Sequence, residues 1–102
     1  MSKKTEVDLK SSLTGLAIRE FLLRTGEASP NDVLRALRRV KAKTSYNSVR
    51  RYFWILRKLG LVEYTRREIG QGAIPKQLYR IVPGKESDSR WSAPQSALYP
   101  RR

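Results

Sequence analysis

Cysteine and histidine are both absent from the 102 residues of this chain. Their absence excludes disulfides, thiol nucleophiles, zinc sites built on these residues and any general base that uses an imidazole. The nine acidic residues are few and scattered, and no glycine-rich motif of the P-loop kind occurs. We therefore expect that the chain is not an enzyme and that it needs no cofactor.

Long hydrophobic runs are also missing. No apolar stretch approaches the roughly 18 residues of a transmembrane helix, and the first ten residues, MSKKTEVDLK, carry charges where a signal peptide would be apolar. We expect no membrane partner and a cytoplasmic protein, associated with the nucleoid if the source is prokaryotic. Hydrophobic residues make up 39% of the sequence, which is enough for the core of one small domain.

Positive charge is what the sequence has in excess. Lys and Arg number 22 against 9 Asp and Glu, so the formal net charge is +13 and the isoelectric point is about 10.8. Residues 33–62 contain no acid and nine bases: Arg35, Arg38, Arg39, Lys41, Lys43, Arg50, Arg51, Arg57 and Lys58. A charge asymmetry of this kind predicts one face for a polyanion, and nucleic acid is the usual polyanion for so basic a domain.

Three helices are predicted in the first 60 residues. The first begins at Ser11 or Ser12 and ends near Thr25 before Gly26, the second is capped by Ser29 ahead of Pro30, and the third runs from a cap at Ser45 to Gly60. Their expected inward positions are Thr14, Ala17, Ile18, Phe21 and Leu22, then Val33, Leu34, Leu37 and Val40, then Val49, Tyr52, Phe53, Leu56 and Leu59.

The chain then changes to a β pattern. Residues 61–66 and 77–82 are rich in β-formers and predict a two-stranded hairpin, with the segment REIGQGAIPK as a long tip. Residues 1–10 are expected to form a flexible N-terminal arm, and residues 11–84 the folded domain. Residues 85–102 have no periodicity, so we expect a flexible basic tail, or one docked only through Trp91, Leu98 and Tyr99.

The stretch SYNSVRRYFWILRKLGLVE resembles the recognition helix and exit of winged helix-turn-helix DNA-binding domains, and KQLYRIV is similar to their returning wing strand. The resemblance covers residues 13–84. It implies an α+β fold of three helices followed by a two-stranded hairpin wing. It also implies that the third helix lies in the major groove of DNA while the wing touches the flanking backbone or minor groove. The simplest function of such a protein is that of a small transcriptional regulator.

Candidate contacts follow from this arrangement. Residues near the start of a helix in the major groove reach base edges, and these are Tyr46, Asn47, Arg50 and Arg51. Asn can pair with adenine and Arg with guanine, which makes the last three the stronger candidates. The residues expected to contact phosphates are Arg38, Arg39, Lys41, Lys43, Thr44, Lys58, Arg66, Arg67 and Lys76.

Three apolar residues are not absorbed by the predicted core. Leu16 and Leu23 form a second narrow line on the first helix, which a partner chain, such as a second copy in a homodimer, or the tail could cover. Trp54 lies on the basic face of the third helix, where packing against protein ranks before stacking on nucleic acid. Four other aromatic residues, Tyr52, Phe53, Tyr64 and Tyr79, are expected in the core.

Duplex DNA is the preferred partner, and two alternatives stay open because the winged-helix scaffold serves several functions. One is an RNA-binding or ribosome-associated protein, in which the basic face would recognise shape and phosphates. The other is a protein-docking winged helix inside a larger nucleic-acid complex, for which Leu16, Leu23 and Trp54 would be contacts.

Overall fold

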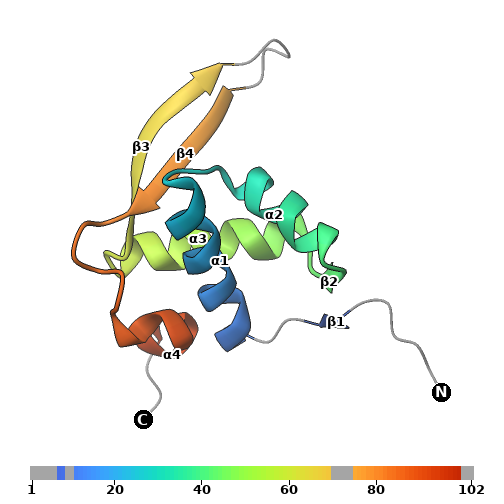
Figure 1. Cartoon of the computed structure of the whole chain (residues 1–102). Helices are drawn as coiled ribbons and strands as arrows, with labels where there is room; N and C mark the ends of the chain where they lie inside the picture. Colours follow the sequence, from blue (N-terminus) through green and yellow to red (C-terminus); the bar gives the residue numbers. More distant parts are fainter. Residues whose placement is uncertain (1–6, 9–10, 70–74, 100–102) are drawn as a thin grey trace, which may run out of the picture.

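The computed structural model describes residues 7–8, 11–69 and 75–99. Their fold is α+β, with helices that form a body and one antiparallel hairpin that projects from it (Figure 1). The main elements are α1 (Ser11–Thr25), α2 (Pro30–Arg39), α3 (Tyr46–Lys58), β3 (Val62–Ile69) and β4 (Pro75–Ile81). They are followed by a 3-10 helix, η1 (Ser89–Ser92), and a short helix, α4 (Pro94–Leu98). The predicted order of three helices and then a hairpin is therefore confirmed in part, since η1 and α4 follow the hairpin.

The ends of the helices are fixed by local residues, as the sequence predicts. Gly26 and Gly60 adopt the left-handed φ angles of +86° and +79° that end α1 and α3. The Ser29 side chain accepts a hydrogen bond from the Asp32 backbone N–H, while the Asp32 carboxylate accepts one from the Ser29 backbone N–H. Ser45 caps α3 by accepting a hydrogen bond from the Ser48 backbone N–H.

One core joins the three helices and the base of the hairpin. Its fully buried members include Ile18 of α1, Val33 of α2, Val49 and Leu56 of α3 and Leu61. Val40, which the pattern of α2 places inward, is instead 69% exposed. The prediction is wrong because α2 ends at Arg39: Val40 is its C-cap, and Lys41 turns the chain with a φ of +62°.

The hairpin is longer than predicted. The two strands pair from Val62 opposite Ile81 to Ile69 opposite Pro75, so half of the segment expected as a tip is strand. Residues 70–74, the remainder of that segment, lie outside the described residues. A β-bulge at Thr65 lies between the pairs Tyr64–Tyr79 and Arg66–Leu78.

Three contacts between the hairpin and the body fix the position of the hairpin. The backbones of Ala28 and Tyr79 exchange two hydrogen bonds, of 3.1 and 2.9 Å. The Arg66 guanidinium donates to the Glu27 carboxylate at 2.8 Å, and the Lys76 ammonium lies 3.1 Å from Asp32. Since Glu27, Ala28 and Asp32 all lie between α1 and the first turn of α2, this short segment anchors both strands.

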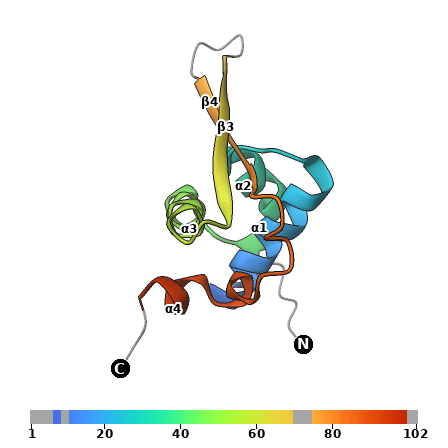
Figure 2. The same cartoon turned by 90° about the vertical axis from the view of Figure 1, so that its left-hand side faces the viewer.

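The C-terminal segment packs against the helical body at the end opposite the hairpin (Figure 2). Trp91 is fully buried, and its indole N–H donates to the Lys85 carbonyl at 2.7 Å. The segment meets α1 at Gly15, where a side chain would collide with the Trp91 carbonyl and the Pro94 ring. Residues 85–99 are therefore docked on the body, as in the second of the two alternatives; Trp91 is the predicted contact that is buried, Tyr99 is 53% exposed, and Pro94 is a contact that the sequence did not predict.

A short parallel bridge brings part of the N-terminal arm to the body. Strand β1 (Val7–Asp8) pairs with β2 (Ala42–Lys43), which lies in the link between α2 and α3. The arm is therefore not free of structure at these two positions, while residues 1–6 and 9–10 lie outside the described residues. Within the part of the chain that the structure describes, no helix is long and apolar enough to cross a membrane.

Candidate nucleic-acid interface

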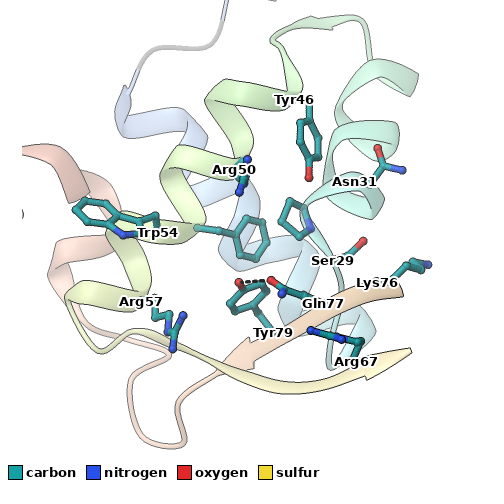
Figure 3. A pocket seen from close by; sticks show the side chains of 12 residues that line it. Ser29, Asn31, Tyr46, Arg50, Trp54, Arg57, Arg67, Lys76, Gln77 and Tyr79 are labelled. Carbon is teal, nitrogen blue, oxygen red and sulfur yellow. Dashed lines mark hydrogen bonds between the residues drawn. The ribbon is translucent and has the colours of Figure 1, made fainter. Parts of the chain in front are cut away.

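A groove of about 780 Å³ lies between α3 and the hairpin (Figure 3). Along α3 it is lined by Tyr46, Arg50, Trp54 and Arg57, which follow one another at three or four residues and so share a face of the helix. The hairpin contributes Arg67, Lys76, Gln77 and Tyr79 to the opposite wall. The start of α2, at residues 29–31, closes one end.

Aromatic rings form a large part of this groove. The ring centroids of Phe53 and Tyr79 are 5.2 Å apart. The contact between these two rings connects the core to the wall of the groove. Trp54 is 48% exposed and Tyr46 44% exposed, so both present free ring surface. Tyr79 is partly buried and donates a hydrogen bond from its hydroxyl to the Gln77 side-chain oxygen, shown dashed in Figure 3.

The prediction that Tyr64 is buried in the core is wrong. It was expected in the core, but it is 40% exposed on the hairpin. Its ring packs edge-on against Tyr79, with the centroids 5.9 Å apart. The neighbouring bulge at Thr65 shifts the strand register, which the alternation of apolar residues alone does not reveal.

The charge in the groove is positive and largely uncompensated. No acidic residue lines it, and Arg50, Arg57 and Arg67 have no ion-pair partner among the described residues. Lys76 differs because it faces Asp32. A concave surface with cations on both walls concentrates a positive potential, which attracts an anion such as a phosphodiester.

The two acids that anchor the hairpin are held ionised by their contacts. Hydrogen bonds from Arg66 and Thr65 lower the pKa of Glu27. Burial raises the pKa of Asp32, but hydrogen bonds from Ser29 and Lys76 outweigh it and the net pKa is lowered. Both carboxylates therefore neutralise a base of the hairpin at neutral pH.

The four candidates for reading bases separate into two sets. Tyr46 and Arg50 line the groove. Asn47 and Arg51 are exposed on α3 but do not belong to its lining. All four lie in the first half of α3 on its solvent side, as the sequence predicts.

The candidates for phosphate contacts are spread more widely. Arg38 and Arg39 end α2, Lys41 turns the chain, Lys43 is exposed on β2, and Thr44 is partly buried beside it. The Lys58 ammonium lies 5.5 Å from the centre of the Trp54 ring, where a cation–π contact holds it. Of the hairpin bases, Arg66 and Lys76 are paired with acids, whereas Arg67 faces the groove.

The residues considered for a protein interface also separate. Leu16 is partly buried and packs against the core, so it needs no partner chain to cover it. Leu23 is 46% exposed, and Trp54 lines the groove between α3 and the hairpin. The structure therefore does not present Leu16 and Leu23 as a continuous exposed line.

Sequence reasoning missed several residues of the groove as site candidates, among them Arg57, Gln77 and Asn31. Arg57 was counted among the bases of residues 33–62, and its spacing from Arg50 and Trp54 could have placed it on the same helical face. Gln77 and Asn31 carry no local signal. They come into the groove only through the pairing register of the hairpin and the approach of α2.

The described residues bring together no group of three or more acids that could hold a metal ion. Comparison of the chain with protein-family models, curated proteins and solved structures finds no match.

Proposed function

We propose that this chain is a winged helix-turn-helix DNA-binding domain and acts as a small transcriptional regulator. In this proposal α3 lies in the major groove of duplex DNA and the hairpin of β3 and β4 is the wing. The observation that carries the proposal is the solvent face of α3, which carries four bases between Arg50 and Lys58, bears no acid and lies beside a hairpin that is fixed to the body.

The dimensions of α3 suit this role. Its 13 residues make a helix about 20 Å long, and the major groove of B-DNA, about 12 Å wide, admits such a helix. The buried face of α3 is anchored by Val49, Phe53 and Leu56, so the solvent face is the side that remains for DNA. A helix held in one orientation can present the same side chains to every base pair that it meets.

Asn47, Arg50 and Arg51 would read base edges in this arrangement, and Tyr46 would lie near the entry of the helix into the groove. Arg38, Arg39, Lys41, Lys43, Lys58 and Arg67 would neutralise phosphates, since none of them has an acidic partner among the described residues. Duplex DNA is preferred because the major groove of duplex RNA is deep and narrow and excludes a helix.

The test is fluorescence anisotropy of labelled duplex DNA, duplex RNA and single strands of equal length, titrated with protein at several salt concentrations. Six phosphate contacts predict a slope of log K against log salt of about −5 for duplex DNA. Tighter binding to duplex RNA would move the function to the RNA-binding alternative. Absence of binding to all three at moderate salt would favour the alternative function, in which the domain docks on another protein.

Recognition of the DNA base sequence by α3 is tested by matched variants. Arg50→Ala and Arg51→Ala are expected to weaken binding by about 1–3 kcal/mol at selected sites and less on random duplexes. Lys43→Ala should weaken binding to all sequences alike, because its expected contact is with a phosphate. An equal loss on all sequences for the two arginine variants would make them phosphate contacts as well.

A further inference from the structure

We propose that the groove between α3 and the hairpin binds an unpaired nucleotide next to duplex DNA, with the base stacked on Trp54. The chain would then favour a duplex that ends in a single-stranded extension over a blunt duplex. This inference rests on the proposed function and adds a second mode of contact to it.

The first support is the exposed ring surface inside a polar, cationic groove. Trp54 is 48% exposed although it lies on a helix with a well-filled core face. The C-terminal segment packs on α1 and, through α4, on the Tyr52 side of α3. The Trp54 ring therefore keeps exposed surface that a base can cover, with the Lys58 ammonium 5.5 Å from the ring centre.

The second support is the geometry of stacking. Inside a continuous duplex both faces of every base are covered by neighbouring bases, so an aromatic ring cannot stack on them. An unpaired base has free faces, and aromatic side chains bind such bases with little dependence on sequence. Trp54 and Tyr46 lie along α3 toward opposite ends of the groove, with Tyr79 facing them from β4 (Figure 3).

The third support is what surrounds the rings. Arg57 flanks Trp54 on α3 and Arg67 faces it from the hairpin, so cations without acidic partners among the described residues are available for the phosphates of the strand. The side chains of Gln77 and Asn31 offer amide groups to the hydrogen-bonding edge of a base. A volume of about 780 Å³ lies within the range of about 300–1,000 Å³ found for small-molecule sites.

The test compares three DNAs that share one duplex: a blunt form, a form with a three-nucleotide extension, and a form whose extension has the sugars and phosphates but no bases. We expect the extension with bases to bind more tightly than the other two, by about 5-fold to 100-fold. The abasic extension separates stacking from the added phosphate charge.

Variants then assign the effect to the groove. In Trp54→Ala the ratio of affinities for the extended and the abasic DNA should fall to about one. Arg51→Ala, on the same helix but outside the groove lining, should weaken binding to both DNAs and keep the ratio. Tryptophan fluorescence gives a second readout, because Trp91 is fully buried and Trp54 is the tryptophan that a stacked base can quench.

The outcomes separate the two proposals. Salt-dependent binding to the blunt duplex with a ratio near one would overturn the unpaired-nucleotide site and leave the proposed function intact. A high ratio that persists in Trp54→Ala would also overturn the site. Equal affinity for the extended duplex and for its single strand alone would support the groove and refute recognition of the duplex, while binding to none of the DNAs would refute both.

Discussion

The docking of the C-terminal segment on α1 can be tested by the sign of one substitution, Gly15→Ala. In an exposed helix interior, replacing Gly with Ala stabilises a protein by up to about 1 kcal/mol, because Ala has the higher helix propensity. Gly15 is buried, and a Cβ atom there would lie 2.8 Å from the Pro94 Cγ atom and still closer to the Trp91 carbonyl oxygen. Separations under 3.0 Å are not found for real Cβ atoms, so the segment has to move.

The size of the destabilisation depends on how far the C-terminal segment is displaced by the new side chain. A small shift has the cost of overpacking, about 1–3 kcal/mol, and complete release of the segment would expose Trp91, which is worth about 3–5 kcal/mol when buried. After the gain in helix propensity is subtracted, we expect Gly15→Ala to lower the free energy of unfolding by about 2 kcal/mol. That change corresponds to a fall in Tm of about 8–16 °C for a domain of this size.

Urea unfolding followed by circular dichroism and by tryptophan fluorescence measures the effect. Arg24→Ala, at an exposed position of the same helix, is the matched control and should change the free energy of unfolding by less than about 0.5 kcal/mol. If Gly15→Ala instead raises the free energy of unfolding, the segment does not lie on α1 and the reasoning is refuted.

Two further predictions concern charged groups. Hydrogen bonds from Arg90 lower the pKa of Asp88 from 3.8 to about 2, so the ionised carboxylate stabilises the fold above pH 3.8 and this contribution is lost as the pH falls toward 2. The difference in Tm between the parent chain and Asp88→Asn should therefore be full at pH 6 and vanish near pH 2; a difference that does not depend on pH would contradict the ion pair. Glu27→Gln removes the negative charge that faces Arg66 and so makes the base of the hairpin more positive; it should tighten binding to duplex DNA and steepen the salt slope by about one, whereas Glu20→Gln removes the same charge elsewhere and should leave the slope unchanged. Equal slopes for the two variants would show that Arg66 does not reach a phosphate.

The helices were predictable because their ends depend on adjacent residues. Gly26, Ser29, Ser45 and Gly60 each act through a turn or a hydrogen bond within about four positions, so the sequence contains the whole cause. The error at Val40 has the same origin. Apolar periodicity continues past Arg39, but the chain turns at Lys41, and a positive φ at a residue other than glycine is not visible in a pattern of hydrophobicity.

The docked segment was harder to predict, because its cause is distant in sequence. Residues 85–99 have no periodic pattern, and a single Trp91 fits either an exposed or a buried position. What decides is the space left by the missing side chain of Gly15, about 75 positions earlier, together with the Lys85 carbonyl that accepts the indole N–H. Such complementarity appears only when both surfaces are placed in three dimensions.

The same segment helps to determine which face of α3 is free for a ligand. Val49, Phe53 and Leu56 turn one side of the helix toward the main core, and a second side meets α4, where the Tyr52 hydroxyl donates to the Gln95 side chain at 3.4 Å. Ile55, one turn after Tyr52, is fully buried although it lies outside the main core cluster. With two sides of α3 covered, the remaining side carries its bases and Trp54, and the hairpin anchored at Ala28 converts that side from a flat surface into a groove. The basic residues of the candidate interface could thus be predicted from local charge, whereas its shape depends on contacts that join α3, the hairpin and the C-terminal segment across the whole chain.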